Sequence, residues 1–291
     1  MTKVYNVTRY GITEQIISKL DKAKQDDEDT DIIDSIASDI IGGLKKKKDF
    51  FTKKDIYICP AKDGSTVNLT IKDIIKISQI IDEKIFVLFP SLNTIYDYFI
   101  RMTKITAELG IPLTWITPAG MKITQHYLKT KQSYVASNFA GRRKKIVYRE
   151  WTNIMNKIKQ NQACIPNIIH SLDATHLIKI ILKAIDDDFS PIITVHDCFG
   201  THPNKMGELE FRVKKEFVLL YTQENFLDTF HNRIIQSILD NKHAIITEDG
   251  KQFVFLYDSK IDFNYKEEIP SIPKLGKLDL EKIIHSKYMI N

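Results

Sequence analysis

Apolar residues recur at helical spacing along much of the chain. Leu177, Ile180, Ile181, Ala184 and Ile185 lie on one face of a segment that runs from 171 to 186. Ser171 or Asp173 is a candidate N-cap for this helix. Similar periodicity predicts five further helices, at residues 4–20, 32–44, 71–83, 91–109 and 204–222.

Extended segments and turns interrupt these helices. Residues 55–70 predict a short extended excursion around the turn at 62–65, and residues 191–195 predict a buried strand. Pro112, Pro118 and Gly120 exclude a long helix between residues 109 and 120. The pattern predicts a helix-rich α+β fold without internal repeats or a sharp domain boundary.

Composition narrows the class of protein. Apolar residues make up 43% of the 291 residues, but no run is long enough to cross a membrane. Three cysteines, odd in number and far apart in the sequence, argue against a disulfide framework or a zinc site and favour a reducing compartment. The net charge of +5 permits a nucleic-acid partner. The excess of lysine over arginine, with abundant Ile and Asn, suggests an AT-rich genome such as that of an organelle or extrachromosomal element.

Residues 121–150 mix extended residues with a basic cluster. Arg142, Arg143, Lys144 and Lys145 are close in sequence to Tyr134, Phe139 and Tyr148. Basic residues interleaved with aromatic rings suit a nucleic-acid strand, and a solvated loop is the alternative. The lysine run at 45–48 is read as a solvated turn or, alternatively, as a phosphate contact.

The dipeptide His196-Asp197 follows the strand at 191–195 directly. A carboxylate at the end of a buried strand is costly unless a cation meets it, and a divalent ion is a suitable partner. A capping role for Asp197 is the alternative. The acidic run at 186–188 ends the helix, and we expect it to be solvated rather than to bind metal.

Five segments of the sequence form an ordered set of motifs. VHDCFGTHP (195–203), preceded by HSLDATH (170–176), resembles the metal-binding C motif, preceded by an HS-x-D segment, of the single-subunit, phage-type RNA polymerases, which include the mitochondrial RNA polymerases. WITPAG (115–120), with Gln125 and Tyr127 after it, resembles a fingers segment, and VYNVTRYGITEQI (4–16) resembles the tail of the B motif. The ending PxxPKxGxLDLxxIxxSxYM resembles the C-terminal segment of the mitochondrial branch.

The resemblance implies specific roles. Asp197 would bind Mg²⁺, one of two such ions in the complete enzyme, and His196 would lie near the RNA 3′ end. Tyr5 would help to select the ribonucleotide, and His170 would contact the minor groove of the template–product duplex. Tyr5 as a core aromatic and His170 as part of a capped helix entry are the alternatives.

The implied architecture is that of a right-hand polymerase. Residues 1–169 would form part of the fingers, and residues 170–291 the C-terminal half of the palm with a foot-like segment. The implied partners are a DNA template, the RNA product and ribonucleoside triphosphates. A mitochondrial location, with a plasmid as the encoding genome, is expected, and a plastid or a phage is the alternative.

Two family motifs have no counterpart in this sequence. The catalytic lysine and arginine of the B motif would fall before Met1, and no segment resembles DGxCxGxQ, which supplies the first metal-binding aspartate. Asn6 stands where the family usually has glycine. We therefore expect the chain to be inactive alone, to need the N-terminal polymerase portion in cis or in trans, and to aggregate through exposed strand edges near Asp197.

Two other functions fit the same fold. One is a non-catalytic, nucleic-acid-binding remnant of such a polymerase. The other is a fragment of a family-A DNA polymerase, whose C motif typically reads HDE. Cys198 and Phe199 follow the His-Asp pair here, which favours the RNA polymerase.

Overall fold

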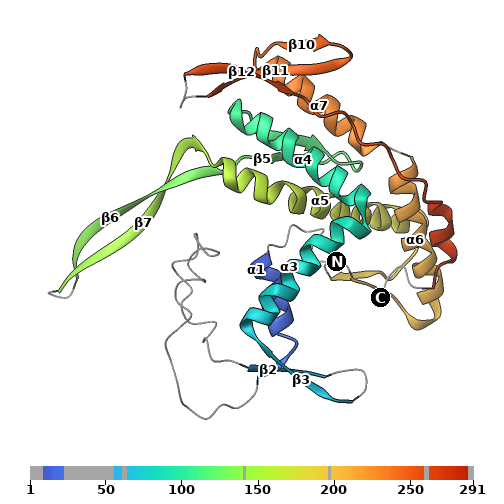
Figure 1. The fold of residues 1–291 in the computed structure, drawn as a ribbon. Coiled ribbons are helices and arrows are strands. Elements are labelled where there is room, and N and C mark those ends of the chain that lie inside the picture. The colour runs from blue at the N-terminus through green and yellow to red at the C-terminus, as the bar shows by residue number, and fades with distance from the viewer. Residues whose placement is uncertain are drawn as a thin grey trace. The chain divides into compact units, whose positions relative to one another are not determined.

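A computed structural model describes residues 9–22, 56–60, 64–139, 142–195, 198–223, 225–258 and 262–287. The chain divides into two compact units, residues 1–90 and 91–291. Helices and small antiparallel sheets make up both units (Figure 1), which confirms the mixed, helix-rich α+β class. In the part of the chain that the structure describes, none of the helices combines the length and the apolar composition that a membrane span requires.

The first unit combines two helices with a three-stranded antiparallel sheet. Its described elements are α1 (Arg9–Ile17), β1 (Asp21–Lys22), β2 (Ile56–Pro60), β3 (Thr66–Thr70) and α3 (Ile71–Leu88). Thr70 caps α3 in a capping box with Asp73, which explains why the helix begins directly after the strand. The Thr13 hydroxyl donates to the Ser78 hydroxyl at 2.9 Å in the buried α1–α3 contact.

The second unit is built around a long helix, α5. Its helices are α4 (Pro90–Glu108), α5 (Lys157–Asp186), α6 (Met206–Thr222) and α7 (Phe226–Asp240), with short 3-10 helices η2 (Pro203–Lys205) and η3 (Leu280–His285). Its strands pair antiparallel as β4 (Leu113–Ile116) with β5 (Lys122–Gln125), β6 (Leu128–Phe139) with β7 (Arg142–Met155), and β8 (Ile193–Val195) with β9 (Cys198–Gly200). The strands β10 (Ile245–Glu248), β11 (Lys251–Asp258) and β12 (Phe263–Glu268) form a three-stranded sheet.

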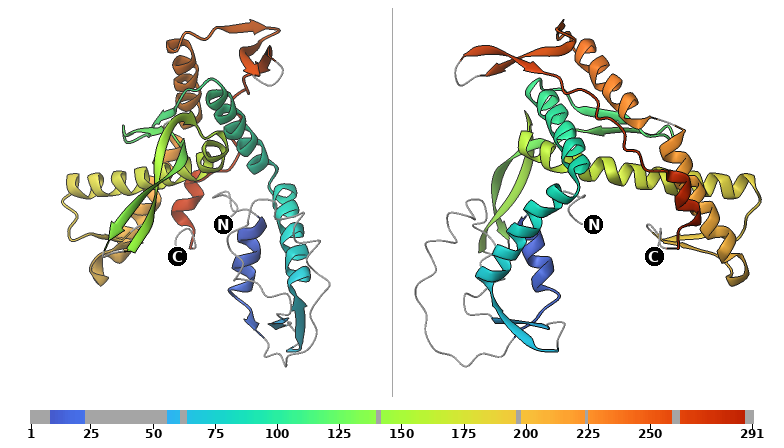
Figure 2. Two further views of the ribbon diagram at one scale, coloured as in Figure 1. Left: turned by 90° about the vertical axis from the view of Figure 1, so that its left-hand side faces the viewer. Right: turned by 45° about the vertical axis from the view of Figure 1, so that its right-hand side comes forward.

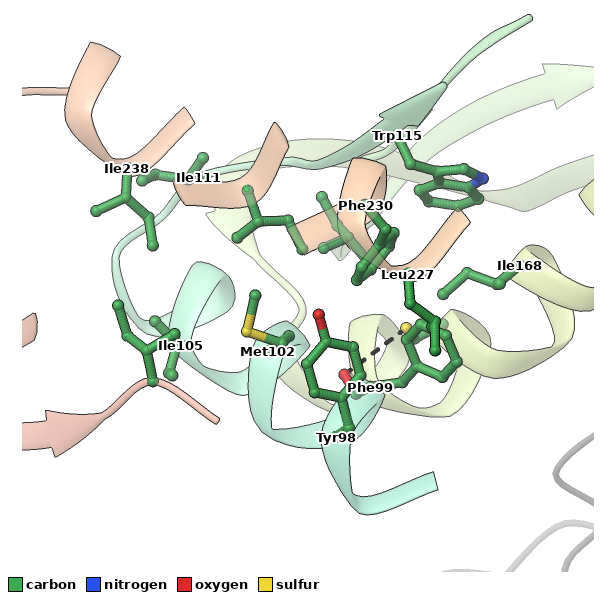
Figure 3. Close-up of a cluster of buried hydrophobic side chains, with 14 of the residues drawn as sticks. Tyr98, Phe99, Met102, Ile105, Ile111, Trp115, Ile168, Leu227, Phe230 and Ile238 are labelled. Atoms are coloured by element: carbon green, nitrogen blue, oxygen red, sulfur yellow. Dashed lines mark hydrogen bonds between the residues drawn. The ribbon is translucent and has the colours of Figure 1, made fainter. Parts of the chain in front are cut away.

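The main core of this unit joins α4, β4, α5, α7 and the β10–β12 sheet (Figure 3). Trp115 of β4 is fully buried, and the rings of Phe99 and Phe230 meet edge to face at 5.2 Å. Aromatic pairs in this geometry add to the free energy gained by burying apolar area. The buried Cys164 places the N-terminal half of α5 in the same core.

A second cluster fixes the C-terminal half of α5 against α6. Its buried members are Ile180, Ala184, Phe189, Leu209 and Val213. On another side of α6 lies η3 (Figure 2), where the Nζ of the buried Lys214 donates to the carbonyl oxygen of Ser286 at 2.6 Å. The helix α6 therefore connects the C-terminal segment to α5.

The helix predicted at 171–186 is longer than the sequence pattern indicated. It begins at Lys157, and its N-cap is Asn156, whose side chain accepts from the amide of Lys159. The prediction of Ser171 or Asp173 as the cap was therefore wrong, because both residues lie inside the helix. Pro166 also lies inside the helix and hides its first half from a reading of the sequence.

Other predicted elements are found close to their expected bounds. The helices at 71–83, 91–109 and 204–222 correspond to α3, α4 and α6, and the extended excursion at 55–70 corresponds to β2 and β3. Within the predicted 4–20 helix, the structure describes α1. The predicted helix at 32–44 and the lysine run at 45–48 lie outside the described residues.

Candidate functional site

A buried hydrogen bond joins the WITPAG segment to the HSLDATH segment. The indole Nε1–H of Trp115 donates to the Ser171 hydroxyl oxygen at 3.0 Å, and that hydroxyl donates to the carbonyl of Ile168 at 2.7 Å. Two backbone hydrogen bonds close the turn after Trp115: the amide of Thr117 donates to the carbonyl of Met121, and the amide of Gly120 donates to the carbonyl of Thr117. Gly120 has a φ of +81°. Such a φ favours glycine. Two segments that lie 56 residues apart thus meet on one face of α5.

A network of amide side chains continues along α5 from this junction. The side chain of Gln125 donates to the carbonyl of Gln160 at 2.9 Å and to its Oε1 at 2.6 Å. Asn167 Nδ2 donates to Gln125 Oε1 at 2.8 Å and to the Tyr127 hydroxyl oxygen at 3.2 Å. Gln125 and Gln160 are buried, whereas Tyr127 and Asn167 are half-buried. The network therefore leads from the interior to the surface.

His170 is exposed on α5, three residues after Asn167. Residues at this spacing are neighbours on a helix surface. Lys159 lies on the same side of α5, with its Nζ 4.6 Å from the centroid of the Tyr127 ring. The predicted minor-groove residue thus neighbours the amide of Asn167, which itself contacts the Tyr127 hydroxyl, and Lys159 lies about 16 Å further along the helix. The alternative of a capped helix entry does not hold for His170, because it lies in the middle of α5.

The strands on either side of His196 and Asp197 form a two-stranded antiparallel hairpin. Val195 of β8 pairs with Cys198 of β9, and the Thr201 hydroxyl donates to the carbonyl of Pro191 at 2.6 Å across its base. Ile193 and Val195 are 64% and 61% exposed, so the prediction of a buried strand was wrong: β8 pairs only with β9 among the described strands. His196, Asp197 and the predicted nucleotide-binding Tyr5 lie outside the described residues.

His176 supports this hairpin and was not identified from the sequence. Its Nε2 lies 2.9 Å from the carbonyl oxygen of Val213 on α6, and its ring meets Phe199 of β9 edge to face at 6.2 Å. Burial lowers the pKa of His176, against the opposing effects of the Val213 carbonyl, Asp173 and Glu216. The His176 imidazole therefore links α5, α6 and β9. The second histidine of HSLDATH was the available signal.

The basic cluster lies on a long two-stranded ribbon rather than on a loop. In the ribbon, β6 pairs with β7: Leu128 lies opposite Met155 at one end, and Phe139 lies opposite Arg142 at the other. The ribbon extends away from α5 (Figures 1 and 2). The Nζ of Lys145 lies 3.4 Å from the centroid of the Tyr134 ring. Lys144 is exposed nearby, and the side chains of Arg142 and Arg143 are outside the described part.

The ribbon also exposes apolar and aromatic side chains. Tyr134, Trp151 and Ile154 are 63%, 69% and 60% exposed. A two-stranded ribbon with such a surface is stabilised weakly by its own contacts. The structure places the ribbon lysines on a different element from His170, so the predicted nucleic-acid residues form two separate groups.

In the acidic run at the end of α5, Asp187 is engaged in ion pairs. Asp187 contacts Lys183 at 2.9 Å and Arg212 at 2.5 Å, and these cations lower the pKa of its carboxyl group. Among the described residues, no group of three His, Cys, Asp or Glu side chains is arranged to hold a metal ion.

The chain is similar to known RNA polymerases along its length. It matches the family described as DNA-dependent RNA polymerase over residues 1–291. It is 38% identical over 292 residues to a probable DNA-directed RNA polymerase of Gelasinospora sp. (strain G114), and 34% identical over 300 residues to one of Neurospora crassa. All of this chain is covered in both comparisons, but only 32% and 31% of those relatives, so it spans about a third of their length.

The names of some more distant relatives include an organelle. The mitochondrial DNA-directed RNA polymerase of Schizosaccharomyces pombe is 31% identical over 187 residues, which cover 62% of this chain and 15% of that protein. Chloroplastic polymerases of Nicotiana species are 25% identical over 191 residues, or 65% of this chain and 16% of each of those proteins.

Proposed function

Because this chain belongs to the family of DNA-dependent RNA polymerases, we propose that it forms the C-terminal part of a template-directed nucleotidyltransferase. The substrates are ribonucleoside triphosphates, the template is DNA and the product is RNA. The observation that supports this proposal most directly is the buried Trp115–Ser171 hydrogen bond, which joins two of the family's segments beside His170.

The residues around α5 suit contact with a template–product duplex. His170 is exposed and neighbours Asn167, and both project from a helix whose other side is buried in the core. A rigid helix held by buried hydrogen bonds keeps such contacts in register with the duplex. In this proposal His170 contacts the minor groove, and Tyr5 helps to select the ribonucleotide.

Asp197 is the proposed Mg²⁺ ligand, with His196 beside the RNA 3′ end. This assignment rests on the resemblance of residues 195–203, since both side chains lie outside the described residues. Bound magnesium supplies activation of the 3′-hydroxyl and charge neutralisation at the departing pyrophosphate. A two-ion site needs a second carboxylate, and this sequence contains no segment like the one that supplies it in the family.

The β6–β7 ribbon is proposed as a second nucleic-acid contact. Lys144 and Lys145 supply positive charge for phosphates, and the exposed rings of Tyr134 and Trp151 supply stacking surfaces. A two-stranded ribbon is also narrow enough to enter the major groove of duplex DNA.

The chain acts together with the rest of a polymerase in this proposal. Residues 1–169 contribute to the fingers, and residues 170–291 to the palm and a foot-like segment; the boundary falls within α5. The missing lysine and first aspartate come from an N-terminal portion, supplied in cis or in trans. The similarity to the mitochondrial polymerase of Schizosaccharomyces pombe favours a mitochondrial location, with plasmid encoding as a further part of the proposal.

Extension of a primed RNA–DNA scaffold tests the proposal. The chain is assayed with Mg²⁺ and ribonucleotides, alone and with a polypeptide encoded by the upstream DNA, as the natural protein and as Asp197→Asn. The matched control is Asp240→Asn, which changes an exposed position in α7.

We expect extension with the upstream polypeptide, retained in Asp240→Asn and lost in Asp197→Asn. Extension by the chain alone would contradict the need for the second carboxylate and the lysine. No extension in either case would favour the non-catalytic, nucleic-acid-binding remnant.

A further inference from the structure

The amide network on α5 has an orientation that its backbone contacts determine. A carbonyl oxygen can only accept, so the Gln125 atom that faces the carbonyl of Gln160 is its Nε2. Gln160 Nε2 in turn donates to the carbonyl of Gln125 at 3.1 Å, which leaves Gln160 Oε1 to accept from Gln125. The Oε1 of Gln125 therefore points toward Asn167.

The orientation of the Gln125 side chain also determines the orientation of Asn167, which is half-buried. Gln125 Oε1 accepts, so the Asn167 atom beside it is Nδ2, and both hydrogens of that amide are used: one by Gln125 and one by the Tyr127 hydroxyl oxygen. Tyr127 is thus the acceptor in this bond, and its own O–H hydrogen has no acceptor within the described part of the chain. Asn167 Oδ1 is likewise left as an acceptor there. A fixed donor and a fixed acceptor stand side by side.

The surface around this pair allows close approach of a ligand. Lys159, Ala163, Asn167 and His170 fall within an arc of about 80° on α5, over a length of about 16 Å. Ala163 has no side chain beyond Cβ to hold a ligand away. Lys159 places a cation at one end of this stripe, where it can meet a phosphate.

We propose that Tyr127 and Asn167 form a recognition site for a ribose 2′-hydroxyl of the RNA strand in an RNA–DNA hybrid. An uncharged donor beside an uncharged acceptor matches a hydroxyl, which both accepts and donates, whereas a phosphate oxygen only accepts. A-form duplexes display their 2′-hydroxyls along a wide and shallow minor groove, which an exposed helix face can reach. The inference rests on the proposed function and adds to it the feature by which this face distinguishes RNA from DNA.

Binding of the full chain to three duplexes of one sequence tests this site at fixed salt concentration. The ligands are an RNA–DNA hybrid, the same hybrid with 2′-fluoro groups in the RNA strand, and a DNA–DNA duplex, each followed by fluorescence anisotropy. Fluorine retains the ribose conformation and removes the hydroxyl. Tyr127→Phe removes one hydroxyl from the protein, and Tyr257→Phe on β11, where the hydroxyl bonds to Asp262, is the matched control.

Tyr127→Phe is expected to weaken binding of the RNA–DNA hybrid about three- to tenfold, the value of one hydrogen bond. Its affinity for the 2′-fluoro hybrid and the DNA duplex should equal that of the natural chain, as should every affinity of Tyr257→Phe. Equal losses on the hybrid and its 2′-fluoro form, or no loss on either, would overturn the inference and leave the proposed function intact. Failure of the natural chain to bind any of the three duplexes would overturn both.

Discussion

Replacement of Ser171 by alanine removes the acceptor of the Trp115 indole N–H. Trp115 is fully buried, so no water can take the place of the hydroxyl. An unsatisfied buried donor costs about 1–3 kcal/mol, and the higher helix propensity of alanine returns about 0.5 kcal/mol at this position within α5. We therefore expect a net loss of about 0.5–2.5 kcal/mol in the free energy of unfolding of the second unit.

Urea denaturation measures this loss directly. The chain has two tryptophans, so in a Trp151→Phe background the fluorescence of Trp115 alone reports on the core. With an m value of about 2 kcal/mol per molar, a loss of about 1.5 kcal/mol lowers the midpoint by about 0.75 M.

Ser237→Ala in α7 is the matched control. Its hydroxyl makes no hydrogen bond within the described part of the chain, so only the helix propensity should change, by a few tenths of a kcal/mol in favour of folding. If Ser171→Ala shifted the midpoint no more than Ser237→Ala, the Trp115–Ser171 bond would not contribute to the junction between the two segments.

Three further predictions concern other parts of the second unit. Burial raises the pKa of the Cys164 thiol to about 12, so iodoacetamide at pH 8 should label the exposed Cys198 but not Cys164 in the folded chain, as measured by peptide mass spectrometry; labelling of Cys164 at the rate of Cys198 would contradict its burial. Replacement of both Lys144 and Lys145 by alanine should weaken nucleic-acid binding and lower the slope of log affinity against log salt by about 1.4–1.8, and an unchanged slope would exclude phosphate contacts there. Val195→Thr on the exposed β8 should reduce aggregation of the chain expressed alone, as followed by static light scattering, and equal scattering would place the cause elsewhere.

Much of the helical structure could be predicted because its apolar periodicity is strong. The segments that became α3, α4 and α6 repeat apolar residues at helical spacing, and each buries one face. The first half of α5 could not be predicted in this way. Its polar residues and Pro166 hide the period, and Gln160 is buried because it bonds to Gln125, 35 residues earlier in the chain.

In the candidate site, too, features that depend on local sequence could be predicted, whereas features that depend on contacts between distant segments could not. The exposed position of His170 on α5 agrees with a role in binding, although the binding itself remains a prediction. The sequence predicts that the basic cluster contacts a nucleic-acid strand or, alternatively, forms a solvated loop; the pairing of β6 with β7 places it on a ribbon, with Lys145 over Tyr134. His176 was missed because its contacts come from α6 and β9, which no local pattern connects to it.

The sequence by itself determined the family, because motifs such as HSLDATH and VHDCFGTHP are short and each can be recognised without its surroundings. It also determined most helices, since helical hydrogen bonds join residues four apart. Only the tertiary structure decided which polar groups meet. The packing of α5 against the β4–β5 segment brings polar groups that are distant in sequence within hydrogen-bond distance. Trp115 therefore bonds to Ser171, and Gln125 orients Asn167. Hydrogen bonds at such sequence separations depend on packing, and packing is a property of the whole fold.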